Sequence, residues 1–252
     1  MDYAQARLQA RFGERPDESS WRGLADARGP EALLEIARAC GLRRWIAGID
    51  ASSDHHRIEI SLRARWRECV AETASWMPER WQPAVLWTAA LADLPALCRL
   101  ARGEAPLDWM RRDPVLGPYA GAQDDARQAK LQQEALAFAG AAWPERGAAA
   151  PAGESFESQV RRAWRDEWRR RWPNRGDAQA LENLAGLMES TFVEPMAAER
   201  HAFLRRLRAQ FRRSTLRPGA AFAFLAFSAL DLERLRAELL ARVLLDRAGL
   251  AS

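Results

Sequence analysis

Residues 217–250, RPGAAFAFLAFSALDLERLRAELLARVLLDRAGL, decide the fold of this chain. Pro218 suits the first turn of a helix, where its missing N–H leaves no bond unmade, and Gly249 suits the position just past the end. Between them, apolar residues recur every three or four positions, which is the period of a helix. They are Phe222, Leu225, Ala229, Leu232, Leu235, Leu239 and Val243, and Phe224, Phe227, Leu230, Leu240 and Leu244 widen the same face. A helix of roughly 30 residues is about 45 Å long, so the rest of the chain or a partner must cover this face.

The opposite side of this helix is predicted to face water. It carries six charged residues, Asp231, Glu233, Arg234, Arg236, Glu238 and Arg242. Glu238 and Arg242 are four residues apart, a spacing at which opposite charges stabilise a helix by about 0.2–0.5 kcal/mol.

The remainder of the chain repeats the helical period and shows no strand pattern. The predicted fold class is therefore all-α, a multi-helix funnel or bundle with a long C-terminal helix. Helices are predicted over 3–11, 18–27, 30–40, 53–77, 124–143, 155–172, 177–193 and 195–213, with short helices between Pro78 and Glu104 and a turn region over 108–121. Asp17, Ser19 or Ser20 is expected to cap the second helix and Ser53 the fourth, and Gly41 is expected to stop the third.

One segment has the composition of a linker. It is PERGAAAPAGE, residues 144–154, which is rich in Pro, Gly and Ala. The predicted organisation is an N-terminal helical part over 1–143, the linker 144–154, and a C-terminal helical lobe over 155–252.

Composition describes a globular chain of 252 residues, 48% hydrophobic and 29% charged, with a net charge of +4. Nearly all of its basic residues are Arg, and Lys130 is the only Lys. No run approaches the ~18 apolar residues of a membrane span, and residues 1–18 lack the apolar core of a secretory signal. A cytoplasmic location is expected. Cys40, Cys69 and Cys98 form no CxxC pair and are expected to be reduced, buried side chains.

Motifs for catalysis and for cofactors are missing from the sequence. It contains no P-loop, no dinucleotide-binding GxGxxG after a strand, and no GxSxG turn. Asp54, His55, His56 and Glu59 have metal-ligand side chains, but a solvated first helical turn accounts for them better than a zinc site does. We therefore expect no catalytic residues, no cofactor and no metal.

Tryptophan and arginine are concentrated in residues 159–175, QVRRAWRDEWRRRWPNR. Trp164, Trp168 and Trp172 fall at i, i+4 and i+8, which places them on one helical stripe. Base stacking on such a stripe contributes about 1–3 kcal/mol per base. Burying one Trp removes about 150–250 Å² from water, worth roughly 4–6 kcal/mol as an upper bound. Burial is the favoured interpretation, and nucleic-acid binding is the alternative.

A second aromatic group lies in WMPERWQPAVLW, with Trp76, Trp81 and Trp87. A proline-interrupted aromatic corner of this kind usually packs between helices. Because Trp is enriched at interface hot spots, these three side chains are also a possible protein-interaction surface.

Two stretches resemble a known family, the connector proteins of rotary V-type ATPases that are called C in prokaryotes and d, or AC39, in eukaryotes. The run FAFLAFSALDLERLRAELLAR, residues 222–242, is similar to the C-terminal signature of that family. Glu233, Leu235, Arg236 and Arg242 stand at the matching positions. The opening DYAQARLQARFGE resembles the family's first helix through Tyr3, Arg7 and Arg11, together with Ala6 and Ala10.

The resemblance implies a non-catalytic connector. Family members form a funnel of helices on the membrane rotor ring, receive the tip of the central shaft, and so couple the two during proton or sodium transport. The resemblance implies rotor-ring and central-shaft subunits as partners, no direct nucleic-acid binding, and contact with the membrane only through those partners. The chain is shorter than the usual three-lobed member, and ARACGLRRW stands where the family has an LxxTxY-type element. The alternative is a basic all-α module that binds nucleic acid or other proteins.

Overall fold

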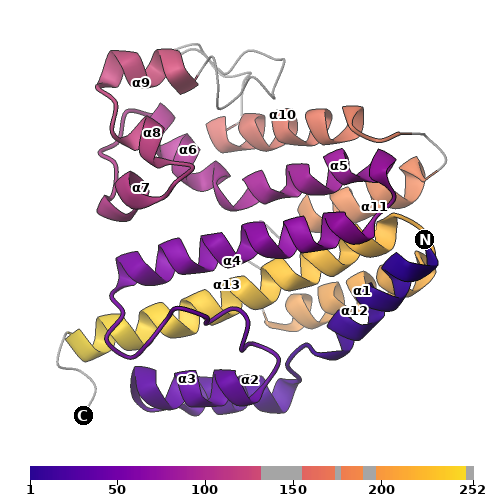
Figure 1. Cartoon of the computed structure of the whole chain (residues 1–252), viewed down its shortest axis with the longest axis horizontal. Coiled ribbons are helices and arrows are strands. Elements are labelled where there is room, and N and C mark those ends of the chain that lie inside the picture. The colour runs from indigo at the N-terminus through magenta and orange to yellow at the C-terminus, as the bar shows by residue number, and fades with distance from the viewer. Residues whose placement is uncertain (132–154, 174–176, 190–196, 248–252) are drawn as a thin grey trace. The chain divides into compact units, whose positions relative to one another are not determined.

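Helices make up all the regular structure in the computed structural model, which describes residues 1–131, 155–173, 177–189 and 197–247 (Figure 1). No strand occurs within these ranges, so the predicted all-α class is confirmed. The predicted linker 144–154, the end of the predicted helix 124–143, and Gly249 lie outside the described residues.

The described residues form two compact units, 1–86 with 173–252, and 87–172. The first unit contains α1 (Asp2–Gly13), α2 (Glu18–Asp26), α3 (Gly29–Ala39), α4 (His55–Trp76), η1 (Glu79–Trp81), α5 (Gln82–Leu86), α11 (Ala178–Glu189), α12 (Ala197–Arg213) and α13 (Gly219–Arg247). The second contains η2 (Trp87–Ala92), α6 (Leu94–Ala101), α7 (Asp108–Arg112), α8 (Gly117–Ala120), α9 (Asp124–Lys130) and α10 (Phe156–Arg170).

This division differs from the predicted lobes 1–143 and 155–252. The first unit combines both ends of the chain, and the second unit is inserted between them. Helix α10, predicted as the start of the C-terminal lobe, packs on α6 of the inserted unit instead. The prediction followed the composition of 144–154, whereas the units follow the side chains that pack together.

Helix α13 is the centre of the first unit. Helices α1, α3, α4, α11 and α12 all pack against it, and α4 runs alongside it (Figure 1). Every residue from 220 to 228 is buried, so the first half of α13 is covered on all sides rather than along one stripe. Further on, Leu235, Leu239 and Val243 keep the predicted inward face. Asp231, predicted to face water, is only 6% exposed.

The residues that cap the first turns of α2 and α4 were predicted correctly for α2 only. Asp17 caps α2, where its carboxylate accepts a hydrogen bond from the Ser20 N–H at 2.8 Å. The prediction of Ser53 as the cap of α4 is wrong, because Asp54 accepts from the Arg57 N–H at 2.7 Å instead. The hydroxyl of Ser53 accepts a hydrogen bond from the backbone N–H of Asp50.

Gly41 allows the segment after α3 to lie directly against the end of α1. A Cβ at this position would stand 1.6 Å from the carbonyl oxygen of Glu14, so no other residue fits without moving the backbone. Helix α3 itself ends at Ala39, and Cys40 is already extended. The predicted role of Gly41 as a helix stop is therefore replaced by a packing role.

In the inserted unit, the predicted turn region 108–121 contains the short helices α7 and α8. Between them, the buried carboxylate of Asp113 accepts hydrogen bonds from the backbone N–H groups of Val115 and Leu116. Ser155 caps α10 by accepting from the Ser158 N–H.

Candidate functional site

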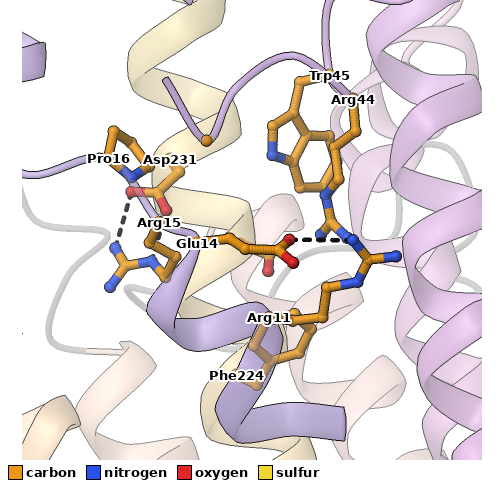
Figure 2. Close-up of a pocket in the computed structure, with 10 residues that line it drawn as sticks. Arg11, Glu14, Arg15, Pro16, Arg44, Trp45, Phe224 and Asp231 are labelled. Carbon is orange, nitrogen blue, oxygen red and sulfur yellow. Dashed lines mark hydrogen bonds and ion pairs between the residues drawn. The ribbon is translucent and has the colours of Figure 1, made fainter. Parts of the chain in front are cut away.

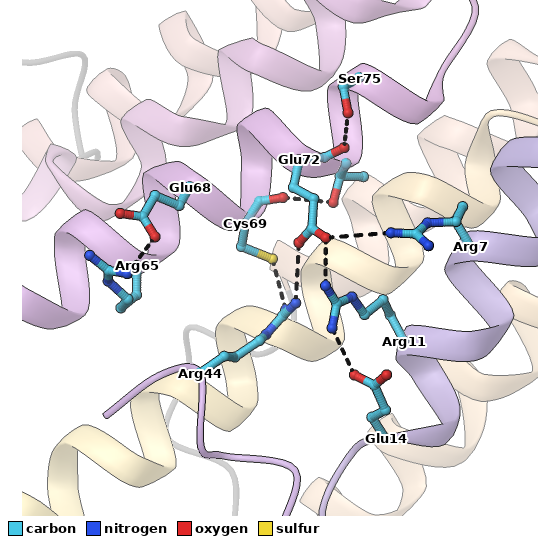
Figure 3. Close-up of polar contacts among 10 residues, drawn as sticks. Arg7, Arg11, Glu14, Arg44, Arg65, Glu68, Cys69, Glu72 and Ser75 are labelled. Atoms are coloured by element: carbon cyan, nitrogen blue, oxygen red, sulfur yellow. Dashed lines mark hydrogen bonds and ion pairs between the residues drawn. The ribbon is translucent and has the colours of Figure 1, made fainter. Parts of the chain in front are cut away.

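The most densely charged place in the first unit surrounds Glu72 of α4 (Figure 3). Its carboxylate lies 2.6 Å from Arg11 Nη2, 3.5 Å from Arg44 Nη1 and 4.0 Å from Arg7 Nη2. Arg7 and Arg11 lie one turn apart on α1, and Arg44 comes from the turns after α3. One carboxylate therefore joins three separate segments of the chain.

Two of these arginines also donate hydrogen bonds to groups other than Glu72. Arg11 Nη1 also donates to Glu14 at 3.0 Å, and the hydrogen bond with Glu72 raises the pKa of Arg11. Arg44 Nη2 donates to the Cys69 thiol at 3.1 Å. Burial, the largest effect, raises the pKa of Cys69, so this thiol is protonated and a poor nucleophile at neutral pH.

A second ion pair, between Arg15 and Asp231, connects the end of α1 to α13. Arg15 Nε and Nη2 donate to the two carboxylate oxygens of Asp231 at 2.6 and 2.8 Å, a bidentate geometry. The two side chains are 16% and 8% exposed. The guanidinium also lies over the rings of Phe227 and Phe12, with its carbon 4.2 and 5.3 Å from their centroids.

A small depression of about 270 Å³, part of it open to solvent, is lined by the Arg15–Asp231 pair and by two of the arginines that contact Glu72 (Figure 2). Its lining includes Arg11, Glu14, Arg15, Arg44 and Asp231. Each lining carboxylate is paired with a guanidinium. The arrangement is suited to holding helices together.

The positions that carry the family resemblance hold α13 in place. Leu235 is fully buried, and Arg236 pairs with Glu59 of α4, a carboxylate that is only 6% exposed. Arg242 pairs with Glu238, as predicted, at 2.5 Å. It also donates to the backbone carbonyls of Leu24 and Ala25 at the end of α2.

Two positions of the same set face solvent. The side chain of Tyr3 is 65% exposed at the start of α1, and Glu233 is exposed on α13. These two, unlike Arg7, Arg11, Arg236 and Arg242, are able to meet a partner without disturbing the packing of the first unit.

Trp76 and Trp81 pack between helices, as the proline-interrupted corner predicts, and the alternative of an interaction surface formed with Trp87 is wrong for these two. Trp76 is 7% exposed and Trp81 is 1% exposed. Their rings lie 6.4 and 6.3 Å from those of Phe224 and Phe222, so both are core residues against α13. Trp87, in the other unit, is partly buried.

The tryptophan stripe of α10 is packed in the inserted unit, as the burial interpretation predicted. Trp168 is 4% exposed and stacks on Trp164, with ring centroids 5.9 Å apart. Trp164 and Trp87 each donate an indole N–H to the other's backbone carbonyl. Arg169 pairs with Asp166 in the same helix. The stripe does not present three open aromatic faces for bases to stack on.

The histidines of α4 do not form a metal site with Glu59. The ring centroids of His55 and His56 lie 3.8 Å from each other, whereas Glu59 turns to Arg236. Within the described ranges, no group of three or more His, Cys, Asp and Glu side chains is arranged to hold a metal ion.

Sequence reasoning missed the partners that organise this region, Glu72, Arg15 and Asp231. Asp231 had a detectable signal, because it stands four residues after Phe227 and four before Leu235. A carboxylate at such a place in an apolar stripe predicts a buried partner of opposite charge. Glu72 gave no comparable signal, because its three arginines come from distant positions.

Comparisons of the chain with protein-family models, with curated proteins and with solved structures find no match. Among the described helices, no single one is long and apolar enough to cross a membrane. The bent pair 79–92 and 94–101 meets the length and composition test when its two parts are taken together.

Proposed function

We propose that this chain is a non-catalytic connector in a rotary V-type ATPase, which couples the central shaft to the membrane rotor ring during proton or sodium transport. Its partners are the ring and shaft proteins of that complex. It lies in the cytoplasm and reaches the membrane through them.

One observation carries the proposal. The two stretches that resemble the connector family come from opposite ends of the chain, yet they lie together as α1 and α13 of the same unit. The bidentate pair between Arg15, two residues after α1, and Asp231 fastens the chain just beyond the first stretch to α13. Stretches that resemble one family and also share one packed unit support a common origin better than two isolated sequence matches do.

The character of the site supports a mechanical role. A connector that transmits torque needs helices that do not slide past one another. Ion pairs from α13 reach the residue Arg15 just after α1, and also α2 and α4, through Asp231, Arg234 and Arg236, and these contacts oppose such sliding. The described residues form two compact units, fewer than the three lobes of the usual family member, so the funnel of this protein would be reduced.

The proposal is tested by purifying the complex from the cells that naturally produce this protein. The tagged protein is purified from detergent-solubilised membranes, and its partners are identified by mass spectrometry. We expect rotor-ring and central-shaft proteins. A variant with Tyr3→Ala and Glu233→Arg is expected to recover less of them, whereas Glu31→Arg, at an exposed position outside the family signature, leaves recovery unchanged.

The proposal is contradicted if the assembled rotary complex lacks this chain and the chain elutes alone in gel filtration. Circular dichroism of both variants checks that a change in recovery does not come from unfolding.

A further inference from the structure

From Arg205 onward, helix α12 and the turn after it carry an exposed face on which every charged residue is arginine. We call it the arginine face, and its members are Arg205, Arg206, Arg208, Arg212, Arg213 and Arg217, all exposed. At about 100° per residue the five members on α12 cover an arc of roughly 160°, opposite the buried Phe203, Leu207 and Phe211. The helix packs on α11 and α13 through that apolar side, so its arginines point outward.

These six guanidinium groups have no partners in the part of the chain that the structure describes. Several other arginines of the chain are paired with acids, as Arg170 is with Glu167 and Arg65 with Glu68. Residues 202–217 include six Arg and no Asp or Glu, although the whole chain has a net charge of only +4. Without these six arginines, the rest of the chain has slightly more acidic than basic residues.

Leu216 adds an exposed apolar side chain beside Arg217. It is 48% exposed, and its φ of +60° is the one positive value at a non-glycine residue in the described ranges. This left-handed conformation is unfavourable for leucine. It is held by a hydrogen bond from the Leu216 N–H to the side-chain oxygen of the buried Gln5, at 3.0 Å. A strained backbone that exposes an apolar side chain indicates a functional position.

We propose that the arginine face and Leu216 dock an acidic protein segment, one that carries several carboxylates next to an apolar side chain. Guanidinium groups bind carboxylates in bidentate geometry, and arginine is enriched at interface hot spots. Like charges three and four residues apart on a helix repel each other. A carboxylate-bearing partner removes that repulsion. The proposal holds whether or not the chain works in a rotary ATPase.

The chemistry of the face favours protein over nucleic acid and over membrane. Single-stranded nucleic acid is bound by basic grooves with aromatic rings for stacking, and the phenylalanines of α12 are buried on the opposite side. A helix that inserts into a bilayer surface needs an exposed apolar face. The apolar side of α12 is already used by α11 and α13.

The test measures binding of the full chain to a fluorescein-labelled helical peptide built from Glu, Ala and Leu, by fluorescence anisotropy. A dT oligonucleotide and phosphatidylserine vesicles serve as competing probes. We expect the peptide to bind, with affinity falling between about 50 and about 200 mM NaCl as screening increases. The triple variant Arg205→Glu, Arg208→Glu and Arg212→Glu should weaken binding by about tenfold or more.

The matched control makes the same charge change at three exposed arginines of the same unit that have no acidic partner among the described residues, Arg28→Glu, Arg38→Glu and Arg43→Glu. It should alter the dissociation constant less than about twofold. Leu216→Gly should also weaken binding, but without changing the salt dependence. Equal losses in the two triple variants, tighter binding of the oligonucleotide or the vesicles, or no peptide binding would each overturn the proposal. Circular dichroism verifies that every variant is folded.

Discussion

Removing one partner of the pair between Arg15 and Asp231 should destabilise the first unit more than the loss of any exposed ion pair does. The change that tests it is Asp231→Asn, which keeps the shape of the side chain and removes its charge. Arg15, only 16% exposed and lying over the rings of Phe12 and Phe227, is then left without an anion to neutralise it.

The magnitude follows from this burial. Breaking a buried pair by removing one member costs about 3–5 kcal/mol, because the remaining charge has lost both water and partner. Exposed pairs contribute about 0–1 kcal/mol. The side chain of Asp231 is 8% exposed and makes a bidentate pair, whereas in the comparison pair the side chains of Arg65 and Glu68 are 33% and 57% exposed. We expect a loss of about 3 kcal/mol for Asp231→Asn and less than about 1 kcal/mol for Glu68→Gln.

Urea unfolding provides the measurement, monitored by circular dichroism and by tryptophan fluorescence, to which Trp76 and Trp81 contribute because they pack against α13. The double variant Arg15→Met with Asp231→Leu removes both charges. It should recover most of the stability lost in the single variant, because no charge is then left buried. The reasoning is refuted if Asp231→Asn costs less than about 1 kcal/mol, or if the double variant is less stable than the single one.

Three further predictions concern single positions. Gly41→Ala should cost about 3 kcal/mol or more of unfolding free energy in urea titration, because the added Cβ collides with backbone; Gly186→Ala, in an open helical position, should instead stabilise by about 0.5–1 kcal/mol. Hydrogen bonds from Ser20 lower the pKa of Asp17 to about 2, below its unfolded value of 3.8. The stabilisation from Asp17 is therefore complete above pH 3.8 and lost as pH falls toward 2. Asp17→Ala should reduce the dependence of the melting temperature on pH in that window. Burial raises the pKa of Cys98 to about 11, so iodoacetamide at pH 8 should alkylate the partly exposed Cys40 much faster than Cys98. Mass spectrometry measures the two rates, and equal rates would contradict the burial of the Cys98 thiol.

The long helix, the all-α class and the cap of α2 were predictable because each depends on residues close together in sequence. Pro218 and the apolar period mark α13, and Asp17 stands at the right distance from the Ser20 N–H that it binds. The choice of Ser53 over Asp54 failed by one position, since either side chain is a good cap and only the backbone geometry selects one.

The polar cluster was not predictable, because its members meet only after folding. The place of Asp231 between Phe227 and Leu235 indicates burial, but it cannot show that the partner is Arg15, which is distant in sequence. Trp76 and Trp81 were ambiguous for the same reason, because the sequence does not distinguish a tryptophan that is covered by a neighbouring helix from one that is covered by a partner protein. What decides both cases is the set of helices around α13, which is a property of the whole first unit.

The insertion of one unit between the two parts of the other determines when this protein is able to fold during synthesis. Residues 1–86 leave the ribosome without α13, the helix against which α1, α3 and α4 pack. At about 5–20 residues per second, translation from residue 87 to the end of α13 at residue 247 takes roughly 10–30 s. For that interval the apolar sides of α1, α3 and α4 have no native surface to cover them, and the nascent chain is a natural client for a chaperone.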